Sequence, residues 1–538
     1  MNTVKNLILL ISLIATSLNC IAQNRFIVFY KNKGDVSTAS YTGLISNKSA
    51  HKRALHQIGF DFHDLPVSKK YIHTLRENAI TIISSSKWLN ASLIETNLSL
   101  MEVKKLNIPI SKIQEVNSNN TRQVNKFKTS SITPKVNSIE TKNLSGINYG
   151  LAQFQTEYYE MEYLHDKGFL GEGISMAFLD VGYDNMNNIS QLSPTFSNNK
   201  VIDTYDFWDD STYVYHKDTH GRGVSFIVLG NEPDTFVGMA PLVNTLLYIT
   251  DDLQTETLQD EFNYVKALER ADSIGVDIVN ASLSYKIFDN PSNDYSYSDM
   301  DGNTAISTLG CNIAAQKGIL IVNSAGNSGH IGAPADAIGI LSVGGAAKFK
   351  SSDYISSTGP TADGRICPNI AGLTENANTI YGNSITGTYY MGTSTAAPFI
   401  SGLAACLMEA HPTHSVSQII DAIQQSANQA QNPDSLIGYG VPNARLADSI
   451  LNSVVSVKLL NHNTSSVSVF PNPSTHRITV ASETLIQKVE IYSVTGQLIQ
   501  THELNQESIH LHIGSKGVFA IRTLLESGKM EYNTVVIH

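Results

Sequence analysis

The sequence predicts an α/β protein: an open parallel sheet with helices on both faces, preceded by a small α+β region and followed by a small antiparallel β-sandwich. In the longest part, residues 146–452, short apolar and β-branched runs alternate with stretches long enough for a crossover helix, as in buried parallel sheets. Before it, strand-like and helix-like stretches alternate over a shorter length. In residues 466–538 the apolar side chains recur with a period of two, which is typical of antiparallel strands.

The composition is that of a soluble globular protein. Of 538 residues, 42% are hydrophobic and 16% are charged, which excludes a mostly disordered chain and a polytopic membrane protein. The 37 Lys and Arg residues against 48 Asp and Glu residues give a formal charge of −11. A mildly acidic chain without a basic run is a poor match to nucleic acid or to an anionic membrane surface, so we expect neither as a partner.

The first residues are typical of a signal peptide. Lys5 precedes an apolar stretch at residues 7–18, and a run of about a dozen apolar residues is too short to span a bilayer. We expect export and cleavage after Ala22, which makes residues 1–22 a signal peptide and leaves no transmembrane segment in the mature chain. A buried N-terminal helix is the alternative, and Cys20 leaves a lipoprotein signal open.

Two segments precede the central part. Residues 23–118 contain the runs FIVFY, AITIISSSKWLNASLIE and MEVKKLNIPISKIQEV, which fit a small α+β domain. Residues 119–145 are rich in Asn, Ser, Thr and Lys and have almost no large apolar side chain. Such a run is typical of an exposed linker, and exposed linkers are preferred sites of proteolysis.

The central part supplies strands and helices in turn. The runs ISMAFLD, NTLLYIT, VDIVNASLS, ILIVNSAGN and IGILSVGGA are short and apolar, whereas DEFNYVKALERADSIG and TAISTLGCNIAAQKG are long enough for helices. The small residues of THGRGVSFIVLG indicate a helix that begins beside its histidine. The last part reads ITV, KVEIYS, IHLHI, VFAIR and NTVVIH, and in IHLHI apolar residues alternate with histidine.

The four cysteines include no CxxC pair, so the sequence offers neither a zinc ribbon nor a thioredoxin-like motif. Removal of the signal peptide would leave Cys311, Cys367 and Cys406. One disulfide with a free thiol and three free thiols both stay open.

Three polar residues lie where an open α/β sheet places its active site, just beyond the ends of strands. Asp180 closes ISMAFLD, His220 begins a helical run, and Ser394 stands between a Gly-Thr turn and a long helix of small residues. A serine hydroxyl needs an imidazole to accept its proton, and the imidazole needs a carboxylate to fix its tautomer. A helix N-terminus at the serine would also point backbone N–H groups at a developing oxyanion.

Each residue taken alone has an ordinary structural interpretation. A serine before a helix is usually an N-cap, a histidine before glycine is usually structural, and an aspartate at a strand end is often a turn residue. The combination is what favours catalysis, together with Asn327, which follows a buried strand between Gly326 and Gly329. An amide at that place could donate a hydrogen bond to an oxyanion.

The central part resembles the subtilisin-like serine proteases. The order Asp, His, Ser is that of the family, and seven segments match its motifs in order over roughly 300 residues. They are ISMAFLDVGYD, THGRGVSFIVLG, GMAP, VDIVNASLS, SAGNSG, GTSTAAP and GYGVPNA. The resemblance implies an α/β serine endopeptidase that needs no cofactor.

The resemblance also implies roles for single residues. Asp180 would orient the general base His220, Ser394 would be the nucleophile, and Asn327 with the backbone N–H of Ser394 would bind the oxyanion. An extended substrate would pair with a substrate-binding strand and enter a specificity pocket with small walls. These substrate-binding positions are Ser282, Leu283 and Ser284 on the strand and Ser324, Ala325 and Gly326 at the pocket.

The sequence departs from the family pattern at several positions without loss of a catalytic atom. Ser284 replaces the glycine of Ser-Leu-Gly, so we expect a Cβ to narrow the cleft where backbone and substrate approach closely. Val181 follows the aspartate, Arg222 lies in the histidine motif, and Thr395 replaces methionine after the nucleophile. Side-chain specificity is therefore not carried over from the family.

The flanking parts resemble known companions of such proteases. Residues 23–118 resemble the inhibitory N-terminal propeptide, so we expect the domain to act as an inhibitor and maturation to cut the linker at 119–145. Residues 466–538, with VFPNPSTHRITV, VEIYSVTGQLI and GVFAIRTL, resemble a type IX secretion system sorting domain. The implied partners are a protein or peptide substrate and the secretion machinery, and the implied destination is the medium or the cell surface. A permanent N-terminal domain and a carbohydrate-binding sandwich are the respective alternatives.

A cluster of acidic residues raises the question of a metal site. Residues 294–303, DYSYSDMDGN, cluster carboxylates and leave calcium open. They lack the full EF-hand spacing, so a solvated loop is favoured and no metal site is assigned.

The alternative to a secreted serine endopeptidase is a catalytically silent subtilase fold that serves as a surface binding or adhesion module. The presence of Asp180, His220, Ser394 and Asn327 together favours the enzyme. A GxSxG esterase is excluded because the second glycine is missing.

Overall fold

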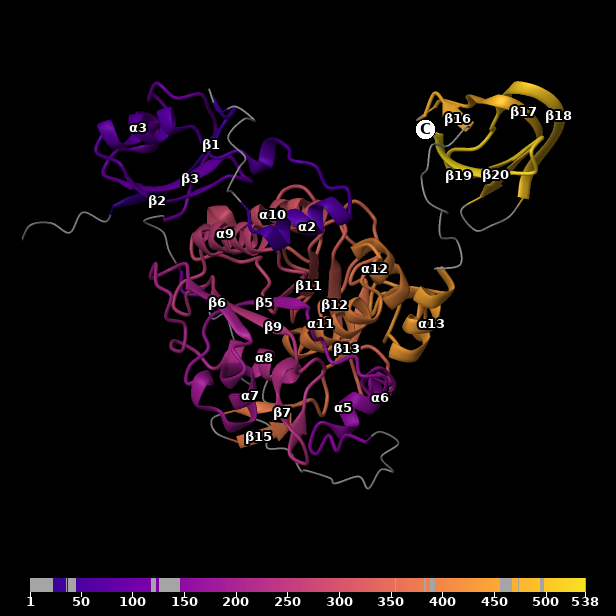
Figure 1. Ribbon diagram of the computed structural model, residues 1–538. Helices are drawn as coiled ribbons and strands as arrows, with labels where there is room; N and C mark the ends of the chain where they lie inside the picture. Colours follow the sequence, from indigo (N-terminus) through magenta and orange to yellow (C-terminus); the bar gives the residue numbers. More distant parts are fainter. Residues whose placement is uncertain are drawn as a thin grey trace, which may run out of the picture. The chain divides into compact units, whose positions relative to one another are not determined.

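Figure 1 shows the computed structural model of the chain, which divides into two compact units, residues 1–453 and 454–538. The described residues are 23–34, 36, 45–117, 122–124, 146–353, 355–381, 384–387, 392–454, 467–472, 474–493 and 498–537. The expected signal peptide at 1–22 and most of the expected linker at 119–145 therefore lie outside the described residues. No described helix is both long and apolar enough to cross a membrane.

The first unit begins with a four-stranded antiparallel sheet of order β2-β3-β1-β4. Its strands are β1 (Asn24–Tyr30), β2 (Thr81–Ser86), β3 (Ala91–Thr96) and β4 (Ile110–Glu115). The helical segments between them are α2 (Asn47–Leu55), η2 (Phe62–Asp64), α3 (Lys69–Glu77) and α4 (Leu100–Val103). The α+β character that the sequence predicts for this region is confirmed.

This N-terminal sheet is buried on both faces. Phe26 and Val28 of β1 belong to a core that the domain's own helices close. Ile27 and Leu93 belong instead to a core shared with the long helix α9 (Leu258–Ile274), because successive side chains of a strand point to opposite faces. In a strand that is covered on both faces, polar and apolar side chains need not alternate, which explains the uninterrupted apolar run of β1.

The central sheet has seven parallel strands in the order β13-β12-β11-β10-β5-β9-β6. The strands are β5 (Ser175–Asp180), β6 (Val201–Asp206), β9 (Asn244–Ile249), β10 (Ile278–Ala281), β11 (Leu320–Ser324), β12 (Leu341–Ala346) and β13 (Ile370–Leu373). This is the open parallel sheet that the sequence predicts.

Helices cover both faces of this sheet, and β5 shows how its residues are divided between them. Met176 and Phe178 share a core with α8 (His220–Leu229) and α11 (Thr393–Ala410). The intervening Ala177 shares a core with α9 and α10 (Ile306–Gln316) on the other face. In Figure 1, α9 and α10 accordingly lie on one side of the strands, and α8 and α11 lie on the other.

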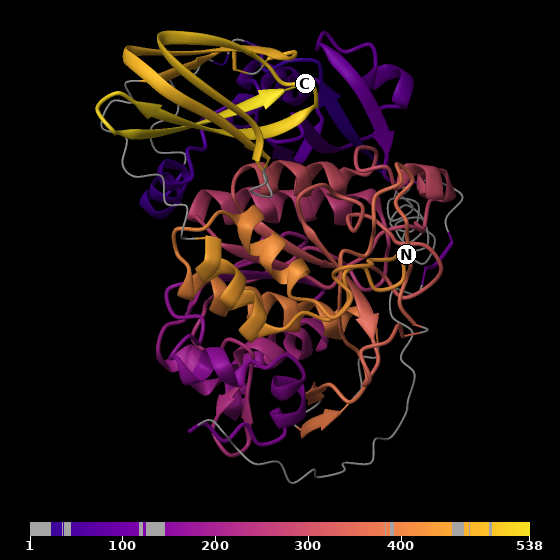
Figure 2. The same cartoon turned by 90° about the vertical axis from the view of Figure 1, so that its right-hand side faces the viewer.

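The remaining elements surround this framework. Figure 2 turns the unit so that the orange segment with α12 (Val416–Gln425) and α13 (Ala444–Val454) faces the viewer. The short helical segments are α5 (Gln153–Tyr158), α6 (Glu162–Asp166), η3 (Met186–Asn188), η4 (Ser190–Leu192), α7 (Ser193–Ser197), η5 (Pro291–Asn293) and η6 (Tyr297–Asp299). The small strands are β7 (Asn231–Glu232), β8 (Phe236–Val237), β14 (Asn378–Tyr381) and β15 (Ser384–Gly387).

A second contact joins the N-terminal domain to the central fold at the C-terminal ends of α9 and α10. Residues 46–64, here called the clamp, lie against these ends: the backbone N–H of Ser46 donates to Ser273 O at 2.7 Å, and its hydroxyl donates to Ile274 O at 2.6 Å. Gly275 ends α9 with φ +91°, and a Cβ there would lie 2.6 Å from the backbone nitrogen of Ser49. A left-handed residue without a side chain is therefore required at this junction.

A buried network of four charges joins the clamp to the helix ends. The Arg53 guanidinium lies 2.9 Å from Asp64 and 2.7 Å from Asp272, and Lys317 Nζ lies 2.7 Å from the other oxygen of Asp64. All four side chains are at most 3% exposed. Two come from the clamp and two from the helix ends, so this network spans the two domains.

The second unit is a five-stranded antiparallel structure. Its strands are β16 (Val467–Phe470), β17 (Arg477–Ser493), β18 (Leu498–His512), β19 (Gly517–Leu525) and β20 (Met530–Ile537). The order is β16-β17-β19-β20, and β18 pairs with β17. Register shifts between Ala481 and Lys488 bend β17, so it can pair with β16 in its first half and β19 in its second. The antiparallel fold predicted for this part is confirmed.

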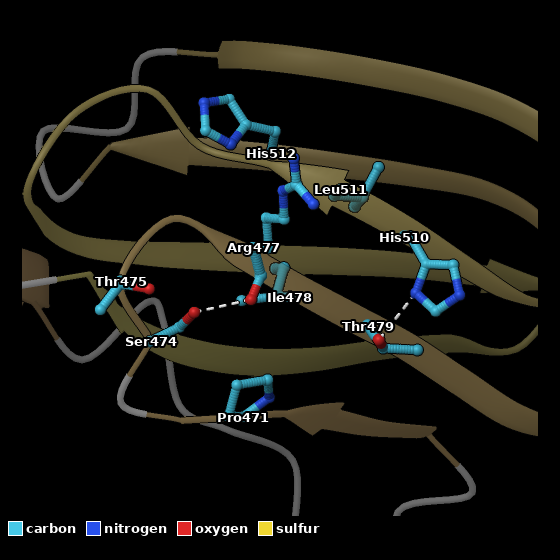
Figure 3. Close-up of a pocket in the computed structure, with 9 residues that line it drawn as sticks. All are labelled: Pro471, Ser474, Thr475, Arg477, Ile478, Thr479, His510, Leu511 and His512. Atoms are coloured by element: carbon cyan, nitrogen blue, oxygen red, sulfur yellow. Dashed lines mark hydrogen bonds between the residues drawn. The ribbon is translucent and has the colours of Figure 1, made fainter.

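A shallow groove crosses this second unit (Figure 3). It is lined by polar and apolar residues of β17 and β18 and of the segment before β17, and His510 bonds to Thr479 across the strands at 2.9 Å. The side chain of Leu511 is buried between the exposed neighbours His510 and His512, as the alternation in IHLHI predicts.

Candidate active site

Asp180 and His220 meet at the carboxyl edge of the central sheet. Asp180 is the last residue of β5, His220 is the first residue of α8, and Asp180 Oδ1 lies 2.7 Å from His220 Nδ1. Both side chains are buried. A Cβ on Gly221 would lie only 2.7 Å from that of Asp180, so glycine after the histidine lets the helix start this close to the strand.

Ser394 lies at the same edge of the sheet, at the start of α11 and beside the end of β10. It is the second residue of α11, and its hydroxyl lies 3.4 Å from the carbonyl of Ser282, which directly follows β10. In return the hydroxyl of Ser282 donates to the carbonyl of Ser394 at 2.9 Å. These contacts fix the first turn of α11 beside the end of β10.

Asn327 lies opposite this turn. Its side-chain oxygen accepts hydrogen bonds from the backbone N–H and the hydroxyl of Thr393, both at 2.9 Å. Because the amide oxygen faces Thr393, the Nδ2 hydrogens at the other end of the amide point away from Thr393. A Cβ on Gly392 would lie 2.5 Å from the Asn327 oxygen, so the Gly-Thr turn before the nucleophile is required by this contact. Asn327 and Ser394 line one pocket.

Burial and charge act against each other on the buried pair. Burial raises the pKa of the Asp180 carboxyl, and the neighbouring His220 opposes that rise. For His220, burial alone would lower the pKa, but the charge of Asp180 and the hydrogen bond to it outweigh burial and raise the pKa above its ordinary value. The imidazole is therefore a stronger base than that of a free histidine.

The pocket that contains Ser394 has a volume of about 220 Å³. Five of the six predicted substrate-binding residues line it, and the sixth, Ala325, is fully buried in a small apolar cluster with Ile331 and Ala333. The five are Ser282, Leu283, Ser284, Ser324 and Gly326. The segments of Ser282, Ser324 and Ser394 thus meet in one cleft, although they are spread over more than a hundred residues of chain.

The hydroxyl of Ser284 lies at the wall of this pocket, close to Gly326. A Cβ on Gly326 would lie 2.9 Å from the Ser284 hydroxyl and 2.9 Å from that of Ser357. The two serines therefore approach Gly326 from different segments, and only the side chain of Ser284 would be removed by a glycine at position 284. Ser357 was not found from the sequence, because it lies in a loop with no motif.

Residues 122–124 of the expected linker also reach the cleft. Val124 lines the pocket of Ser394, together with Asp251, Glu256 and Tyr285. No local pattern in the sequence connects these residues, because they come from the linker and from the segments that follow β9 and β10. Only the folded chain brings them to one place.

Carboxylates gather at two places in the described part of the chain. In the loop 294–303 the carboxylates of Asp299 and Asp301 accept hydrogen bonds from residues of the same loop, at 2.6–3.0 Å. Within the described residues, the group with ligand atoms close enough for one ion is Asp206, Asp209 and His216. The ammonium of Lys217 lies 2.7 Å from Asp206 and 3.2 Å from Asp209, so one positive charge already offsets part of the charge of these two carboxylates.

The cysteines that the structure describes are buried free thiols, namely Cys311, Cys367 and Cys406. Burial raises the pKa of Cys311 and that of Cys367 to about 12 each. These thiols are therefore protonated and unreactive at neutral pH.

Comparison with known proteins matches each part of the chain to a family. The subtilase family profile matches residues 146–440, the peptidase S8 propeptide domain of Bacteroidota matches residues 25–135, and a secretion system C-terminal sorting domain matches residues 468–537. Subtilisin DY of Bacillus licheniformis is 26% identical over 270 residues, which are 48% of this chain and 86% of the relative. Subtilisin E of Bacillus subtilis strain 168 is 25% identical over 316 residues, which are 56% of this chain and 71% of the relative.

Among solved structures, fervidolysin from Fervidobacterium pennivorans, a keratinolytic enzyme related to subtilisin, is similar with a TM-score of 0.54. The match covers 96% of this chain and 76% of fervidolysin at 14% identity, which supports the fold. The family match covers more than half of the chain and includes Asp180, His220, Asn327 and Ser394. The chain therefore belongs to the subtilase family of serine proteases, with an S8 propeptide domain and a secretion-system sorting domain.

Proposed function

We propose that this subtilase is an exported serine endopeptidase that cleaves peptide bonds through an acyl-enzyme on Ser394. The observation that carries the proposal is the 2.7 Å bond between Asp180 and His220 at the sheet edge where Ser394 and Asn327 share one pocket. Each group has the chemistry that its role requires: a carboxylate, a strengthened base, a hydroxyl at a helix start and an amide with free hydrogens.

In the first half-reaction, His220 takes the proton of Ser394 as the serine oxygen attacks the substrate carbonyl. Asp180 keeps Nδ1 of the imidazole protonated, so that Nε2 is the accepting nitrogen, and it stabilises the imidazolium that forms. Asn327 Nδ2 and the backbone N–H of Ser394 donate to the oxyanion. The imidazolium then protonates the leaving amine, and the acyl-enzyme remains.

In the second half-reaction, His220 removes a proton from water, which attacks the ester carbonyl of acylated Ser394. Collapse of this second intermediate returns the proton to the serine oxygen and releases the new carboxylate. No metal or cofactor enters either step. Asp180 stays ionised throughout, because its oxygen accepts the hydrogen bond from Nδ1.

The N-terminal domain would hold the enzyme inactive until export is complete. Its sheet shares a buried core with α9, the clamp anchors it at the helix ends, and residues 122–124 lie along the cleft. A chain that passes through the cleft in this way excludes other substrates. Because Val124 already lies in the cleft, we expect the cut that matures the enzyme to fall between Val124 and residue 145.

The sorting domain directs the chain to secretion across the outer membrane. We assign it to the type IX system, and we expect a signal peptide at residues 1–22 to be removed before that step. The mature protease would then be released or held at the cell surface.

The test is cleavage of fluorescently labelled denatured casein by the purified mature protein, by Ser394→Ala and by the control Ser417→Ala on exposed α12. We expect the wild type and the control to cleave, and Ser394→Ala to lose kcat by a factor of the order of 10⁶. A fluorophosphonate probe should label the wild type at Ser394 only. Absence of both cleavage and labelling in a chain that has lost its N-terminal domain would favour the silent binding module instead.

A further inference from the structure

Residues 122–124 contact the cleft as a peptide ligand would. The Arg122 guanidinium meets both carboxylate oxygens of Asp294 at 2.5 Å, and its backbone N–H donates to Asp289 O at 2.9 Å. The backbone N–H of Val124 donates to the Asp289 carboxylate at 3.1 Å, while its side chain lines the pocket of Ser394. A short peptide is thus bound by its backbone and by one basic side chain.

Both carboxylates are fixed by the protein around them. Asp294 Oδ1 accepts the backbone N–H of Phe288 at 2.8 Å, and Asp289 Oδ2 accepts that of Glu256 at 3.2 Å. Asp289 is largely buried, whereas the Asp294 side chain is 27% exposed and accessible to a ligand. The geometry is therefore in place before a guanidinium arrives, which reduces the entropy lost on binding.

The wider rim of the cleft is acidic. Asp251 and Glu256 line the same pocket as Val124, so four carboxylates lie along the path of residues 122–124. The positive group in this lining is Lys286, whose ammonium is held by the carbonyls of Ser328 and His330 at 2.8 Å each. The excess of negative charge attracts basic peptides.

We propose that this rim is a substrate subsite, and that Asp294 selects peptides with a basic side chain on the N-terminal side of the scissile bond. The inference rests on the proposed endopeptidase function. Residues 122–124 lie N-terminal to any cut made after them, so they occupy the side of the cleft that receives the acyl portion of a substrate. Once the N-terminal domain leaves, the carboxylates of Asp289 and Asp294 no longer bind residues 122–124 and can bind a substrate instead.

The test uses the linker itself as a peptide, residues 116–149, which includes every expected position of the maturation cut, with Arg122 or with Arg122→Gln, Arg122→Lys or Arg122→Glu. The mature wild type, Asp294→Asn and the control Asp301→Asn are each produced from the full chain and assayed with every peptide. Asp301 belongs to the same loop region, but its carboxylate is bonded to Asn303 and Thr304.

We expect Arg122→Gln to lower kcat/KM about fivefold on the wild type, mainly through KM, because exposed ion pairs contribute in this range. The Lys peptide should retain part of the effect, and the Glu peptide should be the poorest. The difference between Arg and Gln peptides should disappear on Asp294→Asn and persist on Asp301→Asn. If Asp294→Asn does not fold, the comparison of kcat/KM among the four peptides on the wild type still tests the basic subsite.

The outcomes separate the two proposals. If the wild type cleaves casein but cleaves the four peptides equally, or cleaves none of them, the basic subsite is wrong and the endopeptidase function stands. If the wild type cleaves neither casein nor any peptide, the endopeptidase function fails and the subsite falls with it.

Discussion

Two buried charge clusters in the first unit differ in their chemistry. The catalytic pair joins one carboxylate, Asp180, to an imidazole that can gain or lose a proton. The clamp joins two carboxylates to a guanidinium and an ammonium, at 2.7–2.9 Å, and these lower the pKa of Asp64 to about 2 although burial alone would raise it. His220 gains and loses a proton in the proposed reaction, whereas the cations around Asp64 keep that carboxylate ionised down to low pH. One cluster is suited to proton transfer and the other to anchoring.

The largest effect is expected where a buried charge loses its partner. Arg53→Met removes the close cation of Asp272 and leaves Lys87 at 3.8 Å as its nearest one. An uncompensated buried carboxylate costs about 3–5 kcal/mol, so the attachment of the N-terminal domain should weaken by that amount. Arg76→Met, at an exposed position on α3, should change the free energy by less than about 0.5 kcal/mol.

Trp88 makes this prediction measurable. It is one of the chain's two tryptophans, and it is buried between the N-terminal sheet and α9, with its backbone N–H bonded to Glu269 at 3.0 Å. In the full chain with Ser394→Ala and Trp208→Phe, fluorescence in a urea titration follows the release of Trp88. Equal midpoints for Arg53→Met and Arg76→Met would contradict the anchoring role of the clamp.

The second effect separates the two clusters by pH. His220 must be neutral to act as a base, and its pKa is raised, so kcat/KM should rise about tenfold per pH unit below that pKa and level off above it. The pKa of Asp64 is lowered from 3.8 to about 2, so its contribution is complete above the higher value and is lost only as the pH falls through the lower one.

Between pH 5 and pH 7 the activity of the mature enzyme should therefore climb, while the difference in urea midpoint between the parent chain and Arg53→Met stays constant. Taking the difference removes the titration of neighbouring groups such as His56, which both chains share. A flat activity profile would contradict the raised pKa of His220. A midpoint difference that shrinks towards pH 5 would show that the clamp loses charge and is not the fixed anchor described above.

The two clusters also differ in how far the sequence reveals them. Asp180, His220 and Ser394 each stand at the end of a strand or the start of a helix within a local run, so the rule that strand ends share one edge of a parallel sheet predicts that they lie near one another. Arg53 and Asp64 look like ordinary surface residues of a polar segment. Their partners Asp272 and Lys317 lie more than 200 positions away, and no local pattern predicts that pairing.

The same limit explains what was missed at the cleft. The serine at position 284 and the glycine at position 326 belong to motifs, so a narrowed pocket could be expected from the sequence. The approach of Val124 to this pocket depends on how the N-terminal domain docks on α9. Docking between domains follows from matching surfaces and leaves no periodic pattern in either segment.

The smallest effect on stability is expected at the ion pair between Arg122 and Asp294, whose side chains are 42% and 27% exposed. Water and salt screen such a pair, so Arg122→Gln should lower the free energy of attachment by about 1 kcal/mol or less in the Trp88 titration. The cleft segment can bind weakly in the zymogen because the clamp and the sheet hold it at a high effective concentration beside Ser394. A loss as large as that of Arg53→Met would mean that the cleft segment, and not the clamp, anchors the N-terminal domain. A cut after Val124 would then leave this main anchor in place, because Arg122 stays on the N-terminal domain, and release of the inhibitor would need a further step.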